Sequence, residues 1–238
     1  GNEVHVAKVD ASVLNYIARA NTQHEDIMKT AKILVCDPYL ELDCAHAVAS
    51  ALKPEFKVQM ITLENLPFAL YDCDLLVVGG GIGDSDVFDD VMSRNNIRAV
   101  QDYVEAGGKY LGICMGAYWA GGLYFDIVPL AIGQYVVTQD NGIDHEDPTI
   151  AKISWQGVEH NMYFYDGCTF HAPTKDTEVV ARYQNGYPMA VIQDRQIGLI
   201  GCHPESESWW FDDFDVNYYS PEHNRLLKDF AIRLVCEA

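Results

Sequence analysis

The segment Gly112-Ile113-Cys114-Met115-Gly116 places a cysteine between two glycines, directly after an apolar run. Glycines two positions before and two after a nucleophile let the chain turn sharply from a strand into a helix, so that the side chain stands at the corner. The Met115 amide would then bind an oxyanion, and the helix N-terminus would favour the thiolate. The pattern predicts a nucleophilic cysteine that forms a thioester from an amide or related acyl group, with a purely structural cysteine as the alternative.

The segment His203-Pro204-Glu205 follows a second apolar run, Gln196–Gly201. The carboxyl ends of parallel strands meet at one edge of a sheet, so His203 would lie near Cys114 if the two strands are neighbours. The imidazole would take the thiol proton, and Glu205 would fix the tautomer of the ring. We therefore predict a catalytic triad of Cys114, His203 and Glu205.

A glycine-rich stretch, Gly79–Gly83, follows a third apolar run. It lacks the G-x-G-x-x-G pattern and is followed by no P-loop lysine, which argues against a nucleotide loop. Taken in order, the three segments resemble the class I glutamine amidotransferase-like superfamily. The resemblance implies three catalytic residues and three residues whose backbone amides form an oxyanion hole: Cys114, His203, Glu205, and Gly80, Gly81, Met115.

One position departs from the superfamily pattern. Glutamine-hydrolysing members carry a glutamine four positions after the nucleophile, where this chain has Tyr118. The Cys-x-Gly-x-Tyr pattern is more similar to the N-terminal domain of biotin–protein ligases and its stand-alone relatives. The biotin ligase catalytic domain has no counterpart in the sequence, so biotin ligation is not implied. Tyr118 and Trp209, which follows the predicted triad, are the expected substrate-pocket residues.

The elements that must position these residues alternate between strands and helices. Apolar runs typical of strands buried on both faces occur at Lys32–Cys36, Asp74–Val78, Lys109–Ile113 and Gln196–Gly201, and Phe56–Leu63 alternates as a further strand. Helices are predicted near Val13–Ala20, at Asp43–Leu52 with Asp43 as cap, at Ile97–Glu105, and from Pro221 with Ser220 as cap. Alternating segments indicate antiparallel strands at Tyr135–Thr138, Ile150–Trp155, Met162–Tyr165 and Glu178–Tyr183.

This order predicts an α/β fold with a doubly wound, mostly parallel, flavodoxin-like sheet and an antiparallel extension around residues 134–190. We expect one domain over residues 1–238, in which residues 1–30 form an N-terminal extension.

The composition limits the partners. The 238 residues include 35 acidic and 16 basic side chains, a net charge of −19, which disfavours nucleic acids and anionic membranes. Seven scattered cysteines include no C-x-x-C pair, so we expect no metal site, and we also expect no cofactor. A small-molecule amide or acyl substrate is the expected partner, while a homo-oligomer or a partner subunit stays open. A cytoplasmic location is expected, although the chain begins at Gly1 and a removed leader stays open.

The sequence thus favours a cysteine-dependent amidase, hydrolase or amidotransferase-like protein that uses a Cys-His-Glu triad. Two alternatives stay open. The first is a non-catalytic ligand-binding or regulatory module on the same fold. The second is a stand-alone glutaminase-type subunit that supplies ammonia to a separate synthetase.

Overall fold

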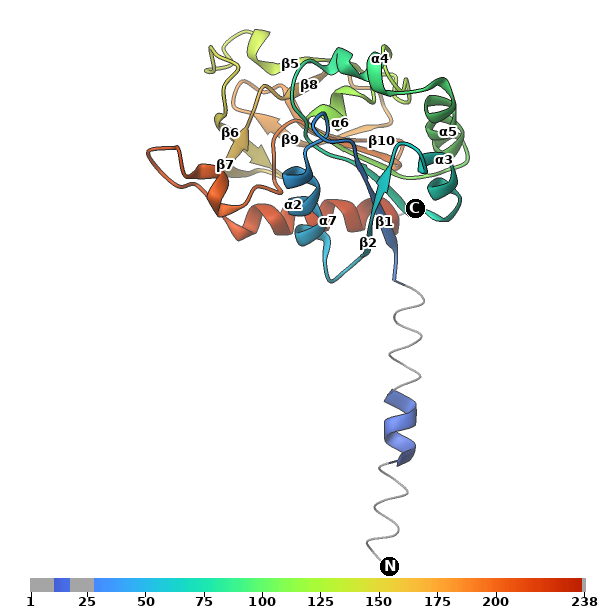
Figure 1. The fold of residues 1–238 in the computed structure, drawn as a ribbon. Coiled ribbons are helices and arrows are strands. Elements are labelled where there is room, and N and C mark those ends of the chain that lie inside the picture. Colours follow the sequence, from blue (N-terminus) through green and yellow to red (C-terminus); the bar gives the residue numbers. More distant parts are fainter. Residues whose placement is uncertain (1–10, 18–27, 237–238) are drawn as a thin grey trace, which may run out of the picture.

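The computed structural model describes residues 11–17 and 28–236 (Figure 1). Within these ranges the chain forms a nine-stranded sheet in the order β2-β1-β3-β4-β11-β10-β9-β6-β7. Five neighbouring strands pair in parallel: β2 (Lys57–Thr62), β1 (Thr30–Val35), β3 (Leu75–Val78), β4 (Tyr110–Ile113) and β11 (Ile197–Ile200). Four strands extend the sheet with antiparallel pairing: β10 (Pro188–Gln193), β9 (Thr177–Tyr183), β6 (Thr149–Trp155) and β7 (Val158–Phe164). A separate two-stranded sheet joins β5 (Ala131–Gln134) to β8 (Cys168–His171).

Helices cover both faces of the parallel strands, which explains why those strands are continuously apolar. Leu75 and Val77 join the core beneath α2 (Leu42–Leu52) and α7 (Pro221–Cys236). The alternate residues of the same strand, Leu76 and Val78, join the core beneath α3 (Leu66–Ala69) and α5 (Arg94–Glu105). The predicted doubly wound α/β fold with an antiparallel extension is therefore confirmed.

The remaining helical segments are short and connect the main elements. They are η1 (Leu70–Asp72), η2 (Ser85–Val87), α4 (Phe88–Val91), α6 (Met115–Tyr118), η3 (Tyr135–Val137) and η4 (Ser208–Phe211). In the part of the chain that the structure describes, no helix has the length and apolar character required to cross a membrane.

Three local predictions need correction or qualification. The segment Tyr135–Thr138 is a 3-10 turn rather than a strand, because the Thr138 amide donates to the Tyr135 carbonyl three residues back, at 3.0 Å. Asp43 lies in the first turn of α2 and does not cap it, since the cap position is Glu41. The predicted N-terminal helix is present over residues 11–17, and its last expected residues lie outside the described residues.

The start of α7 carries a buried histidine whose titration affects stability. The Ser220 hydroxyl accepts a hydrogen bond from the Glu222 amide at 3.2 Å, as predicted for a capping residue. His223 is 3% exposed, its ring centroid lies 5.2 Å from that of His160, and its Nδ1 has no hydrogen-bond partner. Burial and the neighbouring His160 lower the pKa of His223 to about 4, although Glu222 acts in the opposite direction.

This lowered pKa predicts acid destabilisation. Above pH ~6.5 His223 is neutral in both states, whereas between pH ~6.5 and ~4 the unfolded chain takes up the proton first and stability is lost. We expect His223 to account for about 1–2 kcal/mol of the free energy of unfolding that is lost over this pH range, after allowance for solvent screening. Urea unfolding measures the free energy of unfolding at pH 7 and at pH 4.5. The decrease between the two pH values should be smaller for His223→Phe than for the unsubstituted protein. The exposed-site variant His171→Phe is the control, and an equal loss in all three proteins contradicts the prediction.

Candidate active site

Cys114 stands at a strained corner between β4 and α6. It has φ 53° and ψ −104°, a positive φ that non-glycine residues seldom adopt and that clusters at functional sites. A Cβ on Gly116 would lie 1.8 Å from the Val78 carbonyl oxygen, and one on Gly112 would lie 2.4 Å from the Gly116 carbonyl oxygen. Both glycines of the motif are therefore required by close backbone packing. Cys114 itself is 8% exposed, and its thiol donates to the Tyr165 carbonyl at 3.5 Å.

His203 and Glu205 reach the same edge of the sheet because β11 lies directly beside β4. Ile200 of β11 is in register with Ile113 of β4, so the residues that follow both strands emerge together. His203 Nδ1 lies 3.1 Å from Glu205 Oε2, and the two side chains are buried. This contact leaves Nε2 as the ring nitrogen available to Cys114, whose thiol donates to the Tyr165 carbonyl.

The electrostatic environment of His203 favours a protonated ring. Burial by itself would lower the pKa of His203. The charges of Glu205 and Cys114, together with hydrogen bonds to both side chains, nevertheless raise that pKa well above its ordinary value. A raised pKa favours the protonated form of the imidazole.

The three amides assigned to an oxyanion hole have no competing acceptor. Within the described residues, the N–H groups of Gly80, Gly81 and Met115 donate to no other protein group. The glycine loop is fixed from the opposite side, since the Glu41 amide donates to the Gly80 carbonyl at 3.0 Å. A Cβ on Gly81 would lie 1.8 Å from the Tyr39 carbonyl oxygen, so this approach needs glycine. The amides are available to bind a developing negative charge.

Comparison with known proteins agrees with this fold. Residues 41–126 match the family described as biotin-protein ligase, N terminal, a segment that includes Gly79–Gly83 and Cys114 but not His203 or Glu205. A glutamine amidotransferase crystal structure superposes with a TM-score of 0.62 at 17% identity, covering 86% of this chain and 98% of that chain. The fold is that of the glutamine amidotransferases.

Two further structures with this amidotransferase fold are similar over most of the chain. A protein of Thermoplasma acidophilum described as a GMP synthase subunit gives a TM-score of 0.59 at 16% identity, covering 87% of this chain and 94% of that one. A glutamine amidotransferase from Methylobacillus flagellatus gives a TM-score of 0.54 at 14% identity, covering 87% of this chain and 92% of that one. Comparison with curated proteins gives no match. The predicted resemblance to the class I amidotransferase-like superfamily is confirmed.

Tyr118, which stands where glutamine-hydrolysing members carry glutamine, is fixed within this amidotransferase fold. Its hydroxyl donates to the Asp166 carbonyl at 3.0 Å. Burial, reinforced by the neighbouring Cys168, Cys114 and Asp166, raises the pKa of the Tyr118 hydroxyl. The phenol therefore stays neutral and acts as a hydrogen-bond donor.

Removing this hydroxyl has a predictable cost. Tyr118→Phe should destabilise the protein by about 1 kcal/mol, because the hydrogen bond is lost and the Asp166 carbonyl loses its partner. Chemical denaturation measures the change, and Tyr71→Phe, at a side chain that is 89% exposed, is the control. Equal stability of the two variants would show that the Tyr118 hydroxyl is not held as described.

Trp209 does not join Tyr118 in one cavity. It is 52% exposed and lines a cavity of about 680 Å³ between α2 and α7, together with Glu205 and Glu207; neither Cys114 nor Tyr118 lines it. The neighbouring Trp210 packs against the site instead, with its ring centroid 5.7 Å from that of His203.

Sequence reasoning missed Tyr163 and Cys44 beside His203, and it assigned Trp209 rather than the adjacent Trp210 to the site. Tyr163 of β7 lies with its ring centroid 5.7 Å from that of His203, and its carbonyl accepts the His203 amide at 2.9 Å. Trp210 forms a second aromatic wall. Cys44 of α2 lies beside the His203–Glu205 pair. The only signal in the sequence was the position of Trp210 next to Trp209, since Tyr163 and Cys44 approach through the fold.

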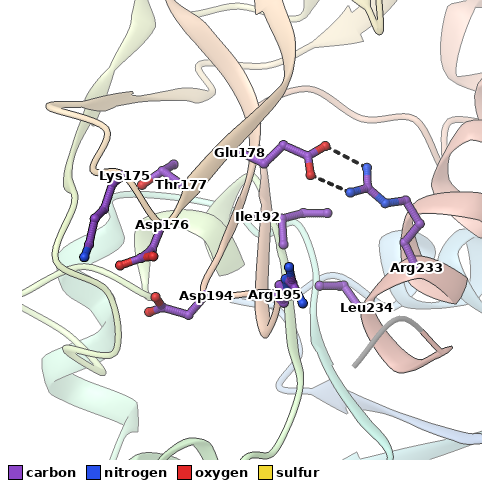
Figure 2. A pocket seen from close by; sticks show the side chains of 9 residues that line it. All are labelled: Lys175, Asp176, Thr177, Glu178, Ile192, Asp194, Arg195, Arg233 and Leu234. Atoms are coloured by element: carbon purple, nitrogen blue, oxygen red, sulfur yellow. Dashed lines mark hydrogen bonds and ion pairs between the residues drawn. The ribbon is translucent and has the colours of Figure 1, made fainter.

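A larger cavity of about 1000 Å³ lies away from the triad, and Figure 2 shows its charged lining. Glu178 and Arg233 form an ion pair there, with Arg233 Nη1 2.8 Å from Glu178 Oε2. Asp194 and Arg195, which also line it, form the turn that precedes β11, whereas His203 follows β11. This cavity is therefore at the opposite end of that strand, and neither Cys114 nor His203 lines it.

Proposed function

We propose that the protein is a cysteine-dependent amidase, hydrolase or amidotransferase that acts on a small amide or related acyl substrate. The observation that carries the proposal is the 3.1 Å contact between His203 Nδ1 and Glu205 Oε2, in the segment after β11, beside the strand β4 that leads into Cys114. This arrangement leaves Nε2 to act on a thiol held at a strained corner.

The proposed reaction begins when His203 Nε2 takes the proton of the Cys114 thiol. The sulfur attacks the acyl carbon, and the carbonyl oxygen gains a negative charge that the amides of Gly80 or Gly81 and of Met115 stabilise. The carbon–nitrogen bond then breaks, and the protonated His203 donates its proton to the leaving amine. A thioester remains on Cys114.

The second half of the reaction releases the acyl group. Water, or an acceptor amine in an amidotransferase, gives a proton to His203 and attacks the thioester carbon. The carbon–sulfur bond breaks, and the thiolate of Cys114 recovers a proton from His203. Glu205 orients the imidazole throughout, as the acid does in other triads.

The test of the proposal is covalent trapping. A panel of acyl and chloroacetamide probes is incubated with the protein, and the labelled peptide is identified by mass spectrometry. We expect a stoichiometric adduct on Cys114 that forms faster than any adduct on the exposed Cys236. Cys114→Ala should abolish both the adduct and turnover of the best amide while the protein stays folded. Turnover that survives in Cys114→Ala would refute the proposal.

A non-catalytic ligand-binding module is the second candidate, and the low exposure of Cys114 favours it. The sulfur belongs to a residue that is only 8% exposed, and Tyr118 is fixed nearby by its bond to Asp166. In this case Cys114→Ala would leave ligand binding intact and no substrate would be turned over. The glutaminase-type alternative requires ammonia release from glutamine, and Tyr118 at the usual glutamine position argues against it.

A further inference from the structure

Cys44 brings a second thiol to the His203–Glu205 pair. A sulfur of Cys44, a ring nitrogen of His203 and a carboxylate oxygen of Glu205 all lie within 4.8 Å of one another, and all three residues are buried. The backbone of Gly80 lies against this group, because a Cβ there would be 3.0 Å from Cys44 Sγ and 2.8 Å from His203 Cε1. Glycine at this position therefore keeps space between the three ligand atoms and the loop.

Glu205 has an unsatisfied oxygen in this cluster. Its Oε2 pairs with His203 Nδ1, but Oε1 is buried and has no hydrogen-bond partner. A buried carboxylate oxygen without a partner is costly, and a bound cation would satisfy it. Within residues 28–236, neither Glu205 nor Glu41 forms an ion pair with lysine or arginine.

A further carboxylate stands at the edge of the cluster. The Cys44 thiol donates to Glu41 Oε2 at 3.6 Å, and Glu41 is partly exposed at the start of α2. Glu41 thus offers a fourth ligand and connects the buried group to solvent. The complete set contains one sulfur, one nitrogen and carboxylate oxygens.

We propose that Cys44, His203 and Glu205, with Glu41 as an additional ligand, bind a divalent cation of the zinc class. Sulfur and imidazole ligands suit Zn²⁺ and disfavour Mg²⁺ and Ca²⁺. Bond lengths near 2.0–2.3 Å place tetrahedral ligand atoms about 3.5 Å apart, so the widest spacing in the cluster must close by about 1 Å. When the ion binds, the Cys44 thiol proton passes to solvent, and a protonated His203 also releases one proton to solvent so that Nδ1 has a lone pair for the ion.

Binding at this position opposes the triad, a consequence that rests on the proposed function. The nitrogen of His203 that faces Glu205 is Nδ1. When Nδ1 coordinates a cation, the neutral ring carries its proton on Nε2 and has no lone pair there for the Cys114 proton. The bound ion is therefore expected to act as a reversible inhibitor.

The first experiment measures binding without reference to activity. The full-length, metal-free protein is titrated with Co²⁺, and Zn²⁺ affinity is measured by competition with a chromophoric chelator. We expect one equivalent to bind, with the absorption of a cobalt–thiolate bond. Cys44→Ser, which preserves volume, should lose that absorption and at least 10-fold in Zn²⁺ affinity. Cys236→Ser and Cys114→Ala are controls that should retain both.

Three outcomes would overturn the site: no stoichiometric binding, unchanged affinity in Cys44→Ser, or an equal loss in Cys114→Ala, which would place the ion on Cys114. Thermal unfolding followed by circular dichroism verifies that each variant is folded. If Cys44→Ser does not fold, Glu205→Gln serves instead and should also weaken Zn²⁺ binding by at least 10-fold. Unchanged affinity in a folded Glu205→Gln variant then overturns the site.

The second experiment separates the site from the proposed function. Alkylation of Cys114 by iodoacetamide is timed with and without one equivalent of Zn²⁺. We expect at least a 10-fold slowing that disappears in Cys44→Ser and is reversed by a chelator. Normal Zn²⁺ binding with a Cys114 that is unreactive in every sample would refute the proposed function and leave the metal site standing.

Discussion

His203→Ala is expected to slow acylation of Cys114 by on the order of 100-fold, the usual contribution of a positioned general base. The imidazole is paired through Nδ1 with Glu205 at 3.1 Å, which leaves Nε2 for Cys114, so the variant removes the group proposed to receive the thiol proton. Rates are measured at one fixed pH with a saturating concentration of an acyl probe, and the adduct on Cys114 is quantified by mass spectrometry.

The controls distinguish loss of the base from loss of structure. His171→Ala replaces a histidine whose side chain is exposed on β8, and it should react at the rate of the unsubstituted protein. Glu205→Gln keeps the size of the side chain. Its acylation rate should lie between those of His203→Ala and His171→Ala, because His203 stays in place but is oriented less strongly. If His203→Ala reacts as fast as His171→Ala, Cys114 is not activated and the ligand-binding alternative is preferred.

The parallel part of the fold, and the placement of Cys114 and His203 after neighbouring strands, could be predicted because each depends on a local signal. Strands such as Leu75–Val78 are buried on both faces, so their continuous apolar runs are visible without any knowledge of contacts. The Cys114 corner needs glycines at fixed positions, and His203 follows a strand end. Once β4 and β11 are assigned as neighbours in one parallel sheet, Cys114 and His203 are expected near each other, because both follow the carboxyl ends of these strands.

Features that depend on packing between distant elements could not be predicted. Cys44 reaches the His203–Glu205 pair because α2 packs on the sheet, and the sequence does not show that residue 44 meets residues 203 and 205. Adjacent tryptophans were indistinguishable in the sequence, but the 3-10 turn Ser208–Phe211 directs Trp210 toward His203 and leaves Trp209 half exposed. Helical or strand periodicity does not specify such a turn.

Gly116→Ala is expected to destabilise the protein by about 3 kcal/mol or more, since the added methyl cannot be accommodated without moving backbone. Its Cβ would lie 1.8 Å from the Val78 carbonyl oxygen, and the Gly116 amide already donates to the Gly79 carbonyl at 3.1 Å. Any shift of α6 that relieves the contact would also displace Cys114 from the glycine loop. Acylation of Cys114 should therefore fall together with stability.

Urea unfolding at pH 7 measures this cost, and Gly122→Ala is the matched control. At that exposed glycine the nearest atom to an added Cβ is a flexible carboxylate oxygen of Asp126 at 3.7 Å, so the change should stay within about 0.5 kcal/mol. Similar stabilities for the two variants would mean that α6 does not pack against β3 this closely. The strained conformation of Cys114 would then be maintained by contacts other than the one between Gly116 and Val78.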